Sequence, residues 1–131
     1  MNDSELVSIM IRTKNEERWI SRCLDSVYSQ NYKNIEVVLV DNISSDKTVV
    51  LAKKYPIKLI SIETFTPGKA INDGIRRSSG SIIVILSGHC IPVNKAWLEN
   101  LIQPLKDSKI AGVYGRQEPM SSTTPIDKRD L

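Results

Sequence analysis

The chain has 131 residues, enough for one domain that buries a real core. Its 40% hydrophobic and 25% charged residues are ordinary for a soluble globular protein. The net charge of +3 is spread along the chain, and one Phe and two Trp provide no stacking platform, so we expect no nucleic-acid partner.

The two cysteines and the first residues argue against several other classes of protein. Cys23 and Cys90 are too far apart for a zinc or redox motif, so we expect two reduced thiols. Acidic residues precede the first short apolar run, unlike a secretory or transit peptide. No apolar run approaches the roughly 20 residues that span a bilayer, so we expect a soluble domain.

Apolar, β-branched runs alternate with amphipathic segments along the chain. The sequence predicts five strands, at residues 7–11, 35–40, 58–62, 81–86 and 110–114. It predicts four helices, at residues 16–30 with Asn15 as N-cap, 44–55 capped by Ser or Asp, 69–79 ended by Gly80, and 94–107. We therefore expect one domain over residues 1–118, followed at 119–131 by an extended or poorly ordered tail rich in Ser, Thr, Pro and charge.

This alternation predicts an α/β fold, a mostly parallel sheet with helices on both faces in three layers. Ligands of such sheets bind beyond the carboxyl ends of the strands. Polar residues follow three of the predicted strands: Arg12, Thr13 and Lys14 the first, Asp41 and Asn42 the second, and Ser87, Gly88, His89 and Cys90 the fourth. We expect these three groups to converge on one crevice.

The side chains at these strand ends suggest what that crevice binds. Asp41 either accepts a hydrogen bond from a pyrimidine imide or a ribose hydroxyl, or caps the turn that follows it. Arg12, Lys14 and Lys69 offer positive charge to a diphosphate, although most basic residues are simply solvated. Asn72 lies in the first turn of the helix predicted from Lys69, where ordinary helix surface is the simpler interpretation.

His89 is the only histidine and follows a buried strand directly after Gly88. A lone histidine is more often a structural hydrogen-bonding group than a ligand, but a neutral imidazole also binds manganese-like ions beside phosphate oxygens. No carboxylate precedes it at Ser87 or Gly88. Cys90 is expected to pack inward as a small hydrophobe.

The joint pattern of residues 7–105 resembles the inverting glycosyltransferases of family 2, which have the nucleotide-sugar-binding GT-A fold. The first half of the likeness is the stretch VSIMIRTKNEERWISRCLDSVYSQNYKNIEVVLVDNISSDKT. The second is GKAINDGIRRSSGSIIVILSGHCIP, which resembles the segment that leads into the family's Asp-x-Asp motif.

The resemblance implies roles for individual residues. Arg12, with Thr13 and Lys14, sits where the first strand approaches the base and ribose, and Asp41 matches the acid that hydrogen-bonds the pyrimidine. Lys69 and Asn72 fall in the segment that lines the ribose and phosphates. Ser87, Gly88 and His89 occupy the place of Asp-x-Asp, and His89 matches the acid that usually binds the divalent cation, Mn or Mg.

Two departures from the family pattern limit these implications. Both aspartates of the metal motif are missing, so metal dependence is either kept through His89 or reduced, with basic residues offsetting the diphosphate charge. The SGHCIP variant resembles rhamnosyltransferases and suggests a deoxysugar donor.

The catalytic base belongs to an acceptor-binding half, and only Glu118, Asp127 and Asp130 follow the last predicted strand, none in a recognisable context. The catalytic residue is therefore unknown.

We thus expect the donor-binding half of a longer enzyme that transfers a UDP- or dTDP-linked sugar to a hydroxyl of a glycan or lipid-linked acceptor, with inversion, in surface polysaccharide synthesis. Alone it should bind donor but transfer little or nothing. We expect a cytoplasmic domain. A peripheral position at the inner membrane face and a homodimer are both left open. The alternative is a non-catalytic nucleotide-binding or interaction module of the same fold. Nucleotidyltransferases and dinucleotide dehydrogenases fit poorly, because no glycine-rich loop follows residues 7–11.

Overall fold

The computed structural model describes residues 4–119 and 121, which fall into two compact units divided after Glu99. The strands are β1 (Val7–Thr13), β2 (Ile35–Asp41), β3 (Ile57–Ser61) and β4 (Ile82–Ser87). The helices are α1 (Ile20–Tyr28), α2 (Thr48–Ala52), α3 (Pro67–Arg77), α4 (Trp97–Ile102) and a 3₁₀ turn, Gln103–Lys106. Among the described residues, no helix is long and apolar enough to cross a membrane.

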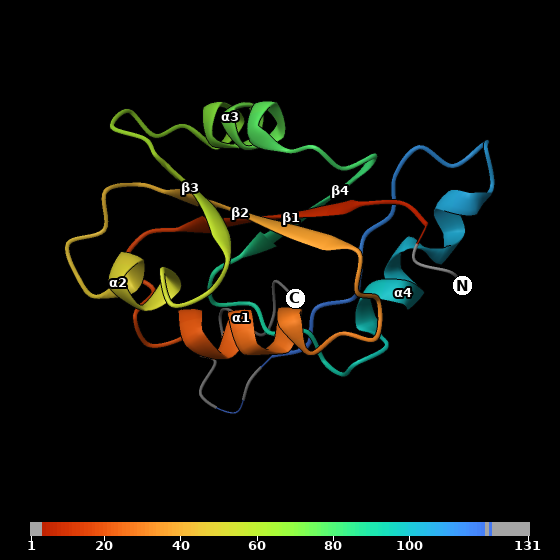
Figure 1. Cartoon of the computed structure of the whole chain (residues 1–131), viewed down its shortest axis with the longest axis horizontal. Coiled ribbons are helices and arrows are strands. Elements are labelled where there is room, and N and C mark those ends of the chain that lie inside the picture. The colour runs from red at the N-terminus through yellow and green to blue at the C-terminus, as the bar shows by residue number, and fades with distance from the viewer. Residues whose placement is uncertain (1–3, 120, 122–131) are drawn as a thin grey trace. The chain divides into compact units, whose positions relative to one another are not determined.

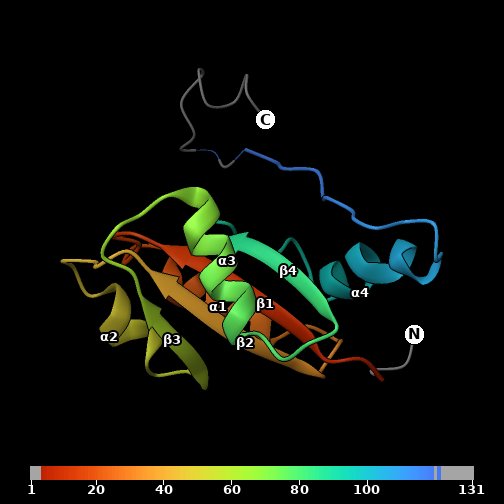
Figure 2. The ribbon, with the colours of Figure 1, turned by 90° about the horizontal axis from the view of Figure 1, so that it is seen from above.

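The four strands form one parallel sheet in the order β3-β2-β1-β4 (Figure 1). The helix α3 packs on one face of this sheet, against β1, β2 and β3 (Figure 2), while α1 and α2 lie on the opposite face. The predicted parallel sheet with helices on both faces is therefore confirmed.

The core is centred on β1, which has a strand on each edge and helices on both faces. Val7, Ile9, Met10 and Ile11 consequently have no exposed surface. Under α3, one apolar cluster consists of Met10, Val38, Val40, Ile62 and Ala70. Burial of apolar area on this scale is the main stabilising term of such a sheet.

Two predicted helices are shorter than expected because their first residues are used in loops. Asn15 is not the N-cap of α1, which begins at Ile20 after Trp19; its backbone has φ 52° and its side chain accepts a hydrogen bond from Ser45. Only residues 48–52 of the helix predicted at 44–55 are helical. The N-cap of α2 is Lys47, not the predicted Ser or Asp, although Asp46, one residue earlier, accepts the N–H of Thr48.

The predicted fifth strand, at residues 110–114, is wrong. This segment has no strand assignment, and Tyr114 is 96% exposed. A strand needs a neighbouring strand for its backbone N–H and C=O groups, and no strand among the described residues pairs with this segment. The helix predicted at 94–107 is divided into α4 and the 3₁₀ turn. The predicted tail lies outside the described residues except for Pro119 and Ser121.

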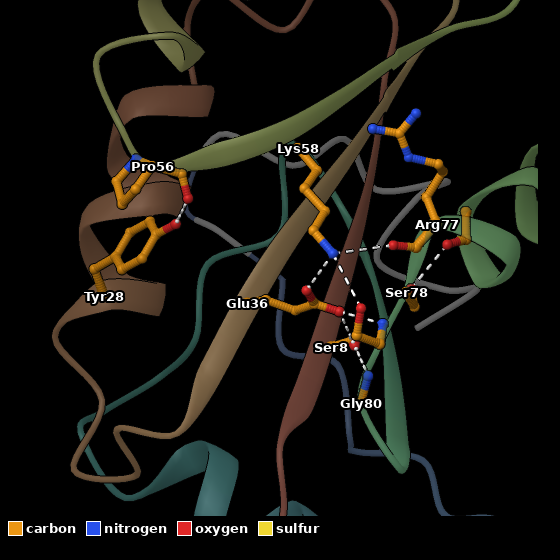
Figure 3. Close-up of polar contacts among 10 residues, drawn as sticks. Ser8, Tyr28, Glu36, Pro56, Lys58, Arg77, Ser78 and Gly80 are labelled. Carbon is orange, nitrogen blue, oxygen red and sulfur yellow. Dashed lines mark hydrogen bonds and ion pairs between the residues drawn. The ribbon is translucent and has the colours of Figure 1, made fainter.

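At the amino ends of the strands, Glu36 of β2 joins β1, β3 and the loop between α3 and β4 (Figure 3). Its carboxylate accepts hydrogen bonds from the Ser8 hydroxyl of β1 at 2.5 Å and from the Ser79 N–H at 2.5 Å, and pairs with Lys58 of β3 at 2.7 Å. Burial by itself would raise the pKa of Glu36, but the hydrogen bonds from Lys58, Ser79 and Ser8 outweigh it and lower the pKa from 4.5 to about 2.

We predict that Glu36→Gln destabilises the fold in a pH-dependent way. A pKa lowered by folding means that the carboxylate stabilises the native state fully above about pH 4.5, and that this stabilisation is lost as the pH falls toward 2. Urea unfolding should show a loss of about 1–3 kcal/mol at pH 7 and a smaller difference from the wild type at pH 3. The exposed Glu63→Gln is the control. An equal loss at both pH values would exclude the charge of Glu36 as the cause.

Candidate functional site

The sheet order reverses between β1 and β4, since β2 and β3 lie on one side of β1 and β4 on the other. In open parallel sheets, the carboxyl ends at such a point border the ligand crevice. Here Arg12 stands opposite Ser87, and the Gly88 N–H donates to the Arg12 carbonyl at 3.0 Å. Two of the three predicted polar groups therefore meet where β1 and β4 end.

Asp41, at the end of β2, links the third group to β1. Its side chain is buried, with 1% of the residue exposed. The carboxylate accepts the Thr13 hydroxyl at 2.6 Å, the Ser44 hydroxyl at 2.6 Å and the Ser44 N–H at 2.8 Å. Asp41 thus caps the turn that follows it, which is one of the two roles that the sequence suggested. Its contact with a base or ribose stays a prediction.

The loops that follow β1 and β2 are held together by a set of hydrogen bonds, which we call the loop clasp. Asn15 and Ile43 both have positive φ, 52° and 43°, which asparagine adopts more readily than most residues but which is rare for a β-branched side chain such as Ile43. The bonds of the clasp run from Lys14 Nζ to Ile43 O, Asn15 N to Ser44 Oγ, Ser45 N to Asn15 Oδ1, Glu16 N to Thr48 Oγ1, Glu17 N to Asp46 Oδ2 and Lys47 N to Glu17 Oε2. Lys14 therefore holds a loop carbonyl in this structure.

Arg12 carries an unsatisfied hydrogen-bond donor. Its Nε is the only buried side-chain nitrogen or oxygen of the described residues that has no hydrogen-bond partner. A buried donor without an acceptor costs free energy, more so when the group is charged. A phosphate or carbonyl oxygen bound in the crevice would supply the acceptor.

His89 follows β4 and is paired with a carboxylate that the sequence analysis missed. Its Nδ1 lies 2.9 Å from Glu16 Oε1 and 3.3 Å from Ser87 Oγ. The His89 side chain is 55% exposed, whereas that of Glu16 is 17% exposed. Glu16 lies 73 residues earlier in the chain, and its position just after β1 is a sequence signal that could have pointed to it.

Gly88 makes room for this pair. A Cβ at this position would lie 2.8 Å from Thr13 Cγ2 and 3.2 Å from Glu16 Cγ, closer than ordinary van der Waals contact. The glycine between Ser87 and His89 therefore allows the Glu16 stem to pass beside the turn after β4.

The remaining predicted residues lie at the edges of the site. Lys69 is in the first turn of α3, where its N–H donates to the Thr66 cap and its Nζ pairs with Asp73 at 2.6 Å. Asn72 is exposed on the same helix and has no hydrogen bond to Arg12, Asp41 or His89 in the described part of the chain. The structure thus brings together Arg12, Thr13, Asp41, Ser87, Gly88 and His89, and leaves Lys69 and Asn72 on α3.

Both cysteines are free thiols. Burial raises the pKa of Cys90 and raises that of Cys23 to about 12, so both stay protonated at neutral pH. They are poor metal ligands and nucleophiles in this state, and Cys90 is only partly buried, so its predicted inward packing is incomplete.

The donor set around His89 sets a limit on metal binding. Within residues 4–119 and 121, no group of three or more His, Cys, Asp or Glu side chains could hold a metal ion. One imidazole nitrogen is available, because Nε2 has no partner among the described residues. A divalent cation fits here only if a bound diphosphate and water supply most of its ligands, an arrangement common for hard cations.

Comparison with known proteins identifies the family. Residues 8–130 match the model of glycosyl transferase family 2. The chain belongs to this family. It is 34% identical over 123 residues to a dolichyl N-acetyl-alpha-D-glucosaminyl phosphate 3-beta-D-2,3-diacetamido-2,3-dideoxy-beta-D-glucuronosyltransferase of Methanococcus voltae, a match covering 83% of this chain and 38% of the relative. Glycosyltransferase AglE of Haloferax volcanii is 33% identical over 120 residues, 86% of this chain and 39% of that protein. The chain thus spans about two fifths of these curated relatives.

Solved structures confirm the GT-A fold. The mannosyltransferase of Pyrobaculum calidifontis, solved with GDP-Man and Mn²⁺, superposes with a TM-score of 0.73 at 27% identity, over 83% of this chain and 35% of that one. TarS of Staphylococcus aureus in complex with UDP-GlcNAc has a TM-score of 0.70 at 27% identity, over 88% of this chain and 37% of that one. TarS is a poly(ribitol-phosphate) beta-N-acetylglucosaminyltransferase.

We predict that Gly88→Ala destabilises the protein by about 1–3 kcal/mol, because the added methyl group must displace Thr13 or Glu16 in a packed site. Urea unfolding followed by circular dichroism measures the change. Gly68→Ala is the matched control, since a Cβ there meets no atom within 4 Å. Wild-type stability of Gly88→Ala would show that the contacts around this glycine are loose.

Proposed function

We propose that this chain is the donor-binding half of a glycosyltransferase and binds a nucleoside-diphosphate sugar, UDP- or dTDP-linked, in the crevice between β1 and β4. The observation that carries this proposal is the buried, unpartnered Nε of Arg12 at the carboxyl end of β1. The relatives solved with UDP-GlcNAc and with GDP-Man support the same class of ligand. The SGHCIP segment suggests a deoxysugar as the donor sugar, which is a more specific form of this proposal.

The proposed roles follow from where each residue lies. Arg12 donates to a phosphate or base oxygen, while Gly88 lets Thr13 and Glu16 pack close to the turn after β4. A carboxylate has about four acceptor sites, and Asp41 already receives three hydrogen bonds. Because Asp41 is 1% exposed, a direct bond from it to the base requires the loop clasp to shift. Lys69 and Asn72 line the ribose and phosphates from α3.

In the proposed reaction, an acceptor hydroxyl oxygen attacks the anomeric carbon, the bond from that carbon to the diphosphate oxygen breaks on the opposite side, and the configuration inverts. A bound divalent cation would neutralise the charge that develops on the leaving diphosphate. His89, with diphosphate oxygens, would hold this cation.

The base that takes the acceptor proton is not assigned to this chain. Glu118 forms an exposed ion pair with Arg116 at 2.9 Å, and Asp127 and Asp130 lie outside the described residues. We therefore propose donor binding with little or no transfer for this segment alone. In the whole protein we propose transfer to a glycan or lipid-linked acceptor in surface polysaccharide synthesis, on the cytoplasmic side of the membrane.

A second candidate is a non-catalytic nucleotide-binding or interaction module. It is favoured by the missing Asp-x-Asp motif and by the lack, among the described residues, of a metal-binding group with three protein ligands. The two candidates differ in whether a cation strengthens nucleotide binding.

We predict that calorimetric titration shows binding of UDP, dTDP or GDP to the wild type, strengthened by Mn²⁺. Arg12→Gln should weaken this binding about tenfold or more, because a charged hydrogen bond to the ligand is lost. The exposed Arg77→Gln removes a positive charge elsewhere on the same unit and should bind like the wild type.

Each alternative result has a distinct meaning. A folded wild type that binds none of the three nucleotides would contradict the donor-binding proposal and favour an interaction module. Binding that Mn²⁺ does not change would favour the non-catalytic nucleotide-binding module. Equal affinities of Arg12→Gln and Arg77→Gln would remove Arg12 from the site.

A further inference from the structure

The pair formed by His89 and Glu16 is asymmetric. Among the described residues, the imidazole makes its polar contacts with Glu16 Oε1 and Ser87 Oγ through Nδ1. An ionised carboxylate can only accept a hydrogen bond, so a neutral imidazole facing Glu16 carries its proton on Nδ1. Nε2, on the far side of the ring, is then the unprotonated nitrogen with a free lone pair.

Glu16 is held in place independently of His89. Its backbone N–H donates to the Thr48 hydroxyl at 2.7 Å, as part of the loop clasp. On the other side, the missing side chain of Gly88 lets the Glu16 Cγ approach the turn after β4. The Glu16 side chain is 17% exposed, so water competes less for it than for the half-exposed imidazole.

We infer that Glu16 is a positioning residue, which fixes the tautomer and orientation of His89 so that Nε2 is presented to a divalent cation shared with the bound diphosphate. The inference rests on the proposed function for the cation and the diphosphate. Histidines that ligate metals commonly donate their other ring N–H to a carboxylate, and losing such a partner typically costs 10–100-fold in metal affinity. Glu16, Gly88 and His89 together then take the cation-binding role of the two aspartates in the family's Asp-x-Asp motif.

The tautomer can be read without any ligand, because His89 is the only histidine in the chain. In a ¹⁵N-labelled sample at about pH 8.5, where a free imidazole is neutral, long-range ¹H–¹⁵N correlation separates the two ring nitrogens. We expect the Nδ1–H form in the wild type and a shift to the Nε2–H form in Glu16→Ala. Glu16→Gln keeps a carbonyl oxygen as acceptor and should restore much of the Nδ1–H form.

A control variant separates this effect from general loosening of the clasp. Glu17→Ala removes the neighbouring carboxylate, which accepts the Lys47 N–H within the clasp but makes no contact with His89 in the described structure. Its histidine spectrum should match the wild type. A tautomer that Glu16→Ala leaves unchanged, or that Glu17→Ala changes equally, would overturn the inference.

The cation is tested by titrating Mn²⁺ into protein saturated with UDP, or with whichever of UDP, dTDP and GDP binds. Glu16→Ala should weaken Mn²⁺ binding about 10–100-fold while metal-free nucleotide affinity stays within about twofold of the wild type. An unchanged Mn²⁺ affinity would overturn the inference although nucleotide still binds. Failure of the wild type to bind any of the three nucleotides would overturn the proposed function instead, and the tautomer measurement would then decide by itself whether Glu16 positions His89.

Discussion

The buried carboxylate of Asp41 is the constraint on which the site depends. A buried carboxylate is costly unless its oxygens are hydrogen-bonded, and the Thr13 hydroxyl together with the Ser44 hydroxyl and N–H satisfies those of Asp41. The ends of β1 and β2 are thereby fixed relative to each other. The loop clasp continues this connection and places Glu16 beside the turn after β4.

A second carboxylate ties the strands together at their opposite ends, where the strands begin. Glu36 joins β1, β2 and β3 at their amino ends through Ser8 and Lys58 (Figure 3). Between these two polar ties the central strand is entirely apolar and buried from Ile9 to Ile11. Hydrogen bonds and an ion pair thus hold the strands together at both of their ends, and apolar packing holds them together in the middle. This arrangement keeps the site residues in a defined geometry before any ligand binds.

Within the crevice, the distribution of partners separates structural groups from groups free to act on a ligand. Asp41 and Lys14 have protein partners, so a ligand must compete with the fold for them. Arg12 Nε and His89 Nε2 have none in the described part of the chain, and they lie on β1 and just after β4, on either side of the point where the sheet order reverses. In the proposed function, a diphosphate would supply the acceptor for the arginine and share a cation with the imidazole.

The sequence by itself determined the fold class, the position of the strand ends and the family, because β-branched runs, helix periodicity and motif spacing are local properties of the chain. It placed Arg12, Thr13, Asp41, Ser87, Gly88 and His89 at one edge of a parallel sheet, as the structure confirms. The finer errors came from non-local competition. Asn15 looked like a helix cap but bonds the second loop, and residues 110–114 looked like a strand but have no strand partner. Only the tertiary structure could decide that Glu16 faces His89, because 73 residues separate them and the contact exists only where the β1 loop crosses the end of β4.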